Sequence, residues 1–284
     1  MATFREALRI AQAALSEKDL PQQEAQLLMV ELCQLQVHDL YTEIDQEMEP
    51  ELQKQYEEGV ERLLKQEPLA HILGYEWFYG YRFTVNEDVL IPRPETEELA
   101  ANILADYDEY FADAEDVTLA DIGTGSGALA VTLKKEAEAL NVIGTDISER
   151  AIAVACENAK SNQAAVPFMI GDMLEPLIDR NLKVDILVSN PPYIPIDEQM
   201  ETSVVDYEPH VALFGGEDGL KFYRIIFENC RKVLKDKAMM AFEMGWNQSE
   251  AMRKLVKEYF PNDRFEIIKD MSGKDRMLFI YINL

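Results

Sequence analysis

Residues 117–127 read VTLADIGTGSG, and their pattern indicates the fold class. Its first half is apolar, as in a buried strand, and its second half is a run of alternating glycines. Glycine lets the backbone turn sharply and approach a ligand closely because it has no Cβ atom. A helical pattern follows from Ala128, so the stretch predicts a strand–loop–helix unit that can bind a nucleotide-type ligand.

The same unit recurs along the rest of the chain. Further strands are expected at 141–146, 167–172, 184–190 and 238–243, and helices at 149–160, near 217–234 and at 247–259. Strands that alternate with helices predict a doubly wound, mostly parallel α/β sheet of the Rossmann-like kind. The last two strands, 264–270 and 276–282, are joined only by MSGKD, which favours an antiparallel pair at the sheet edge.

The N-terminal part has a different pattern. Thr3 and Glu6 have the spacing of a capping box, and an apolar face follows at Phe4, Leu8, Ala11 and Leu15. A second helix is expected from Pro21, with Leu28, Leu32 and Leu35 on one face, and a third from Pro50, with Leu52, Tyr56, Val60 and Leu63. The aromatic segment around Gly80 predicts a hairpin. We therefore expect a helical domain at 1–75, a β-hairpin linker at 76–91 and the α/β domain at 92–284.

Acidic side chains follow consecutive strands. Asp146 ends the second strand, and Asp172 ends the third with Met173 beside it. Ligands bind at the carboxyl ends of parallel strands, so we expect Asp146 to accept ribose hydroxyls, Asp172 to reach an adenine edge and Met173 to pack on the adenine. The predicted cofactor site also includes the loop residues Gly123, Thr124, Gly125, Ser126 and Gly127. The loop alone leaves a nicotinamide-binding domain open, because Gly123, Gly125 and Ala128 also fit the pattern GxGxxA.

Asn190-Pro191-Pro192-Tyr193, directly after the apolar strand VDILVS, favours a different chemistry. Two prolines stiffen the turn and remove two backbone donors. The Asn190 side-chain oxygen and the Pro191 carbonyl can each accept one hydrogen of a planar –NH2 group, and Tyr193 can stack on it. An amide nitrogen is a poor nucleophile because its lone pair is delocalised. Acceptors can hold the nitrogen roughly 3–3.5 Å from a methyl carbon and stabilise its developing positive charge. This arrangement favours methyl transfer over hydride transfer.

Composition excludes several classes of protein. The formal net charge is −26, from 53 acidic and 27 basic residues, and such a surface repels phosphate backbones. It favours solubility or attraction of a basic protein partner. The three cysteines contain no CxxC pair, and His38, His71 and His210 share no metal spacing, so no metal site is expected. Ser126 has no partner histidine or acid, which argues against a serine hydrolase. No signal peptide or apolar run of about 18 residues is evident, so we expect a cytoplasmic protein without membrane contact.

Several segments, in order, resemble the HemK/PrmC family of release-factor (protein N5-)glutamine methyltransferases. They are EPLAHILGYEWFYGYRFTVNEDVLIPRPETEEL, DIGTGSGALA, GTDIS, NPPYIP and YEPHVALFGGEDGL. IPRPETE beside NPPY is the specific signal, because NPPY also occurs in nucleic-acid methyltransferases. Family members often carry Tyr at the position of His71, and Trp or Leu at that of Met173.

The resemblance implies a class I methyltransferase fold, S-adenosylmethionine as cofactor and a class-one peptide chain release factor as protein partner. The implied reaction is methylation of the glutamine side-chain amide nitrogen in the Gly-Gly-Gln motif. It assigns the loop from Gly123 to Gly127, Asp146, Met173 and Asn190 to the cofactor, and Asn190 to Tyr193 to the glutamine. It also implies that residues 1–75 help hold the release factor, and that the pocket is lined by Pro92, Arg93, Pro94, Glu95 and Thr96. We expect a monomer.

Two alternatives remain open at this point. The first is an N6-adenine or N2-guanine nucleic-acid methyltransferase, which the net charge and the lack of a basic recognition domain oppose. The second is a cofactor-bound scaffold that docks on a translation protein without chemistry, which the intact NPPY segment opposes.

Overall fold

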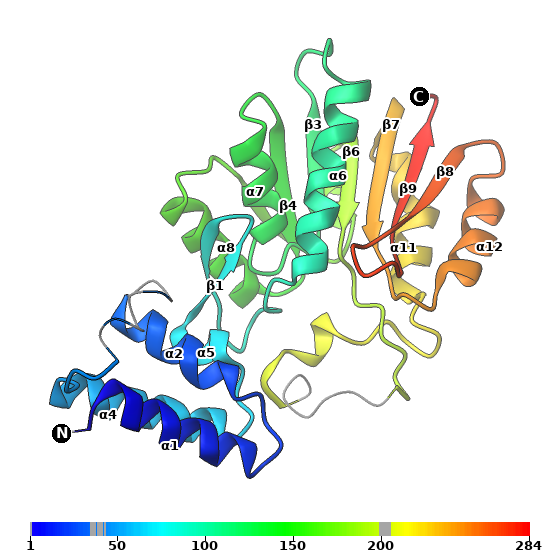
Figure 1. The fold of residues 1–284 in the computed structure, drawn as a ribbon. Helices are drawn as coiled ribbons and strands as arrows, with labels where there is room; N and C mark the ends of the chain where they lie inside the picture. Colours follow the sequence, from blue (N-terminus) through cyan, green and yellow to red (C-terminus); the bar gives the residue numbers. More distant parts are fainter. Residues whose placement is uncertain (1, 35–37, 39–41, 43, 199–205) are drawn as a thin grey trace. The chain divides into compact units, whose positions relative to one another are not determined.

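The structure, a computed structural model, describes residues 2–34, 38, 42, 44–198 and 206–284. They form two compact units (Figure 1). The first contains the described residues up to Tyr75 together with Asp206 and Tyr207, and the second contains 76–198 and 208–284. Each unit has its own buried apolar core.

The first unit is a helical bundle. Its helices are α1 (Phe4–Ser16), α2 (Gln23–Cys33), α4 (Pro50–Leu63) and α5 (Leu69–Leu73). The capping box at Thr3 and Glu6 is confirmed. The predicted apolar face of α1 is buried, as are Leu28 on α2 and three of the four apolar residues expected on α4. Leu32 packs partly on this core, and Leu35 lies outside the described residues. α2 begins two residues after Pro21, whereas α4 begins at Pro50 as predicted.

The predicted hairpin is present, and all of it except Tyr75 belongs to the second unit. β1 (Tyr75–Phe78) and β2 (Tyr81–Thr84) form a two-stranded sheet. Phe78 and Phe83 meet edge to face, with ring centroids 6.0 Å apart, and pack with residues of α7 and α8. Buried Asn158 of α8 accepts the Thr84 N–H at 2.7 Å. The same side chain donates to the Ser126 carbonyl at 2.8 Å, so it ties the hairpin to the glycine loop.

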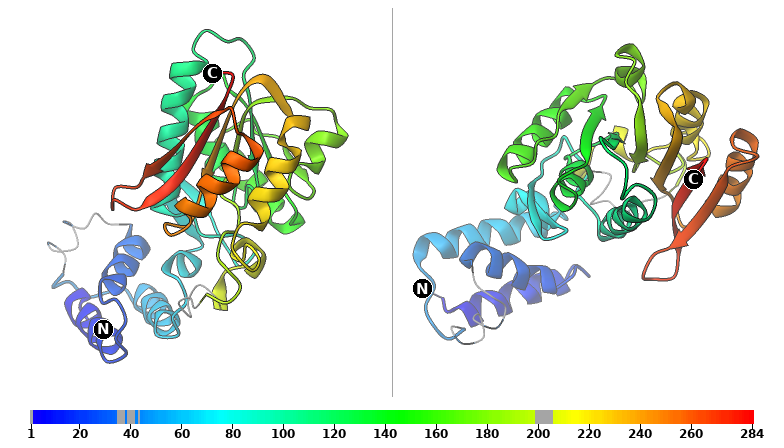
Figure 2. Two further views of the ribbon diagram at one scale, coloured as in Figure 1. Left: turned by 90° about the vertical axis from the view of Figure 1, so that its right-hand side faces the viewer. Right: turned by 90° about the horizontal axis from the view of Figure 1, so that it is seen from above.

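The main sheet has the predicted topology. Its strands are β3 (Thr118–Ile122), β4 (Asn141–Asp146), β5 (Phe168–Ile170), β6 (Val184–Ser189), β7 (Leu234–Glu243), β8 (Arg264–Lys269) and β9 (Asp275–Ile282). Their spatial order is β5-β4-β3-β6-β7-β9-β8. The first five are parallel, β9 is antiparallel to β7, and β8 is antiparallel to β9. Figure 2 shows this late hairpin at the sheet edge, which confirms the antiparallel prediction.

Helices cover both faces of the sheet. They are α6 (Pro94–Tyr110), α7 (Ala128–Glu136), α8 (Glu149–Ser161), α9 (Glu175–Asp179), α11 (Lys221–Asn229) and α12 (Ser249–Tyr259), with 3-10 turns η1 (His210–Ala212) and η2 (Cys230–Lys232). In Figure 1, α6 crosses one face and α11 the other. The central strands are apolar on both faces: Ile186 and Val188 of β6 join the core under α6 and α7, while Leu187 joins the core under α11 and α12. In the described part of the chain, no helix is both long and apolar enough to cross a bilayer.

Candidate functional site

A cavity of about 270 Å³ lies where the parallel strands β3, β4 and β6 end. Loops that follow these strands contribute to its lining, together with segments 88–96 and 209–222. Twelve of the predicted site residues line it: Pro92, Arg93, Thr96, Gly123, Thr124, Gly125, Ser126, Asp146, Asp172, Met173, Asn190 and Pro192. Pro94, Glu95, Gly127, Pro191 and Tyr193 do not line it, although each is next in sequence to a residue that does.

The glycine loop adopts backbone angles that favour glycine. Gly123, Gly125 and Gly127 have φ of 72°, 54° and 78°. The Thr145 carbonyl at the end of β4 accepts the N–H groups of Gly123 and Thr124, at 2.9 and 2.8 Å, which binds the loop to the sheet. A Cβ at Gly127 would lie 3.0 Å from that of Ala155, so this glycine also allows α7 and α8 to pack closely.

Asp146 is held in a fixed orientation. Its Oδ2 accepts the Gly125 N–H and its Oδ1 accepts the Ser148 N–H, both at 2.9 Å. Burial raises the pKa of the Asp146 carboxyl, while these N–H groups favour its charged form. Met173 has a positive φ of 45°, and its carbonyl accepts the Thr145 hydroxyl at 3.3 Å. The ends of β4 and β5 are therefore joined at the cavity.

Asp121 is a buried carboxyl at the cavity that the sequence analysis did not single out. It is 1% exposed and accepts the Thr124 hydroxyl at 2.6 Å. Burial raises the pKa of Asp121 to about 7, and the nearby Asp146 charge adds to the shift. Its position at the end of a strand, just before the glycine loop, is the sequence signal that points to Asp121.

Contacts with three other segments hold the Asn190–Tyr193 corner and the strand end before it. The Ser189 hydroxyl donates to the Ile122 carbonyl at 2.6 Å, which joins the ends of β6 and β3. Gln248 Nε2 donates to the Tyr193 carbonyl at 2.9 Å. A Cβ at Gly215 would lie 2.5 Å from the Pro192 carbonyl, so the segment after η1 lies directly against the prolines. The corner is rigid because its neighbours, as well as its prolines, restrict it.

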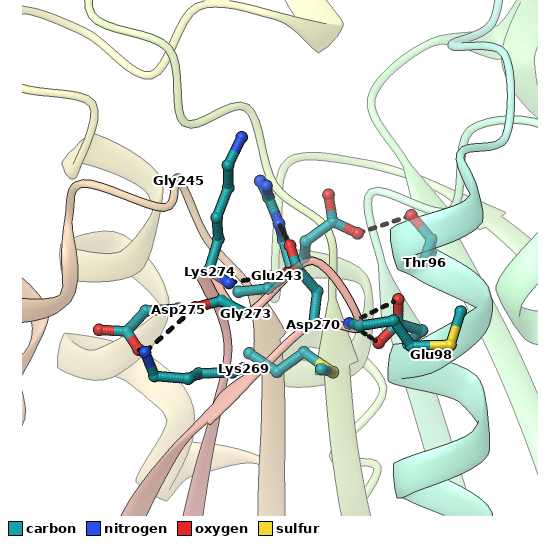
Figure 3. Close-up of polar contacts among 12 residues, drawn as sticks. Thr96, Glu98, Glu243, Gly245, Lys269, Asp270, Gly273, Lys274 and Asp275 are labelled. Atoms are coloured by element: carbon teal, nitrogen blue, oxygen red, sulfur yellow. Dashed lines mark hydrogen bonds and ion pairs between the residues drawn. The ribbon is translucent and has the colours of Figure 1, made fainter.

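Asn190 is linked to α6 and β7 through polar side chains. Its Nδ2 donates to Thr96 Oγ1 at 3.2 Å, and the Thr96 hydroxyl donates to Glu243 Oε2 at 2.6 Å. Figure 3 shows the contact between Thr96 and Glu243. The Tyr193 hydroxyl donates to Glu243 Oε1 at 3.2 Å, and burial raises the pKa of this tyrosine. Glu243 could not be recognised from the sequence, since an acid at a strand end looks solvated until the fold buries it.

Besides Glu243, a further buried acid, Glu208, holds the segment 92–96 at the cavity. Arg93 pairs with Glu208, whose other oxygen accepts the Ile91 N–H at 3.0 Å. The Glu208 side chain is 1% exposed. Glu208 could not be recognised from the sequence, because the pairing joins residues 115 positions apart.

Among residues 2–34, 38, 42, 44–198 and 206–284, no group of three or more His, Cys, Asp or Glu side chains is arranged to hold a metal ion. His210 packs edge to face on Phe214, with ring centroids 5.7 Å apart.

Comparison with known proteins identifies the class. The chain matches the PrmC N-terminal domain family over residues 6–74 and the methyltransferase small domain family over residues 101–206. A methyltransferase structure from Pyrococcus furiosus has a TM-score of 0.53 at 18% identity, covers 79% of this chain and 98% of its own, and supports the fold. Fold and family together define a class I S-adenosylmethionine-dependent methyltransferase. The nicotinamide-binding interpretation that the glycine loop left open is therefore wrong.

Full-length relatives narrow the assignment. The release factor glutamine methyltransferase of Bacillus cereus is 41% identical over 96% of this chain and 97% of its own length. That of Bacillus subtilis strain 168 is 40% identical over 98% and 97%. The chain belongs to the release factor glutamine methyltransferase family.

Proposed function

We propose that this enzyme transfers a methyl group from S-adenosylmethionine to the side-chain amide nitrogen (N5) of the glutamine in the Gly-Gly-Gln motif of class-one peptide chain release factors. The substrate assignment is supported by the near-full-length similarity to enzymes named for that activity. The domain at 1–75 would help hold the release factor, with the hairpin at 76–91 joining it to the methyltransferase domain at 92–284. We further propose that it acts in the cytoplasm as a monomer, without direct contact to nucleic acid or membrane.

The cavity residues fit the cofactor. A carboxylate offers about four acceptor positions, and each Asp146 oxygen already accepts one backbone N–H, so positions remain for two ribose hydroxyls. Asp172 and Met173 line the cavity where the adenine would lie, and the glycine loop presents backbone without Cβ atoms. Thr124 and Ser126 of the same loop also line the cavity. When bound, S-adenosylmethionine supplies an electrophilic methyl group on a sulfonium sulfur.

The corner residues would orient the glutamine. Asn190 Nδ2 is engaged by Thr96, which leaves the Asn190 Oδ1 as the acceptor for one amide hydrogen. The Pro191 carbonyl would accept the second. Together they would hold the nitrogen in place and stabilise its developing positive charge, so a proton can leave after methyl transfer and no strong base is needed. Neither Pro191 nor Tyr193 lines the cavity, so acceptance by the Pro191 carbonyl and stacking of Tyr193 on the amide both stay predictions.

The substrate is tested by competition. Purified enzyme and labelled S-adenosylmethionine are incubated with a release factor, ribosomal RNA and DNA, and the labelled release-factor peptide is identified by mass spectrometry. Label on the Gly-Gly-Gln glutamine is the expected result. Predominant label on nucleic acid would refute the substrate and favour the alternative of a base methyltransferase. Cofactor binding without transfer to any acceptor would favour the scaffold.

The role of the corner is tested by Asn190→Ala. Removing one oriented electrostatic group typically lowers turnover by about 10²- to 10³-fold. Asn141→Ala is the matched control, because Asn141 is exposed at the opposite, amino end of β4. Turnover of Asn190→Ala equal to that of Asn141→Ala would contradict the assignment.

A further inference from the structure

Glu243 is a buried carboxyl that the proposed reaction does not use. It ends β7 and is 2% exposed, and burial raises its pKa. Its side-chain hydrogen bonds come from hydroxyls, namely those of Thr96 and Tyr193. Its main-chain carbonyl accepts a third hydroxyl, that of Tyr223, at 2.6 Å. A buried charge is costly, so its retention between the asparagine and the tyrosine of the corner needs an explanation.

The direction of these hydrogen bonds provides one. The Thr96 hydroxyl donates its hydrogen to Glu243 Oε2 at 2.6 Å, which is the direction that a carboxylate oxygen, as an acceptor, requires. The Thr96 oxygen can then only accept from Asn190, and the group that it meets must be the NH2 end of that amide. The Asn190 Oδ1 therefore points away from Thr96. Reversal of the amide would turn the Thr96 hydrogen to Asn190 and leave the buried carboxylate without its 2.6 Å partner. Such a loss corresponds to roughly a 5- to 150-fold preference for the observed orientation.

Burial raises the pKa of Glu243, whereas the hydrogen bonds from Thr96 and Tyr193 lower it. Arg276 lies near enough to lower the pKa of Glu243, although burial has the larger effect and raises it. Arg276 Nε donates to Asp270 at 3.1 Å, and Asp270 also accepts the Lys274 N–H at 2.9 Å in the turn between β8 and β9. Figure 3 shows this turn beside Glu243 and Thr96. The antiparallel hairpin thus places a cation behind the carboxyl.

We propose that Glu243, acting through Thr96, is a positioning residue that keeps the Asn190 amide oxygen directed at the acceptor nitrogen. The proposal rests on the proposed function only for the identity of that acceptor, since any planar –NH2 group would need the same orientation. Through Tyr193, the same carboxyl also holds the far end of the corner.

The decisive variant is Thr96→Val, which keeps the shape of the side chain and removes the hydroxyl. We expect kcat with the release factor to fall roughly 10- to 100-fold, with KM and the dissociation constant of the cofactor product within about twofold of the parent. Thr96→Ser restores the hydroxyl and should recover most of the lost rate. Glu243→Gln should give an intermediate loss, because an amide can both donate to and accept from Thr96.

Thr132→Val is the matched control. Thr132 is fully buried in α7, and its hydroxyl has no hydrogen-bond partner. The same chemical change there should leave kcat unchanged. A Thr96→Val enzyme as fast as Thr132→Val, or a Thr96→Ser enzyme as slow as Thr96→Val, would overturn the proposal.

A second measurement does not depend on the substrate. In NMR spectra, the Asn190 side-chain NH2 signals are identified by their loss in Asn190→Ala. These NH2 hydrogens should exchange with solvent at least several-fold faster in Thr96→Val than in the parent. Equal exchange would overturn the orientation even if the rate fell. If the parent enzyme does not methylate the release factor, only the proposed function is refuted. The exchange measurement would still test the hydrogen bonds that join Glu243, Thr96 and Asn190.

Discussion

Replacing Asp121 with asparagine should make the stability of the second unit depend differently on pH. The side chain is 1% exposed and meets the Thr124 hydroxyl at 2.6 Å, so an amide of the same shape can keep that hydrogen bond through its oxygen. The amide does not titrate and carries no charge to bury. The variant therefore separates the cost of the buried charge from the packing of the side chain.

The magnitude follows from the pKa. Burial raises the pKa of Asp121 from 3.8 to about 7. Between these values the folded state holds a proton that the unfolded state has lost, so the free energy of unfolding falls as pH rises, by up to about 1.4 kcal/mol per pH unit. Over three units this is about 4 kcal/mol, an upper limit because water entry and local relaxation reduce the penalty of a buried charge. The stability is fully present below pH 4 and lost as pH rises through 7.

Urea unfolding of the parent and Asp121→Asn at several pH values between 4 and 8 measures this effect. Both tryptophans, Trp77 and Trp246, lie in the second unit, so their fluorescence reports its unfolding. Titrating groups that do not interact with Asp121 cancel in the difference, whereas the effect of the neighbouring Asp146 charge remains part of it. The variant should gain stability relative to the parent as pH rises, and the difference should level off above about pH 8. A difference that stays constant from pH 4 to 8 would refute the argument that Asp121 ionises at a cost.

Two further predictions concern the cofactor carboxyl and the corner. Asp146→Asn loses one charged acceptor, so titration calorimetry with the demethylated cofactor product should show affinity roughly 10- to 150-fold weaker; unchanged affinity would contradict the ribose assignment. Gly219→Ala places a Cβ against the Tyr193 carbonyl and 2.5 Å from Gln248 Nε2, whereas Gly273→Ala, at a similarly positive φ, meets nothing within 4 Å. Both share the backbone strain, but only Gly219→Ala should displace the corner and lower kcat by roughly 100-fold; equal rates would show that the corner tolerates the shift.

The structure confirms the predictions that depend only on local sequence patterns. The capping box at Thr3, the Pro50 helix start and the strands before Gly123 and Asn190 depend on neighbours within a few residues. The second helix start was wrong by two residues, because Pro21 precedes the helix instead of occupying its first turn. The connection MSGKD also indicated the antiparallel edge pair, since five residues are too few for a crossover between parallel strands.

The alternation of strands and helices, the glycine loop and the diproline corner could be predicted, because each is encoded by residues close together in the chain. Which acids are buried depends on the tertiary structure. Glu243 and Glu208 lie 147 and 115 residues from their partners Thr96 and Arg93. Nothing in the local sequence distinguishes such acids from solvated ones, because the desolvation that changes a carboxyl's behaviour comes from whatever the fold packs around it.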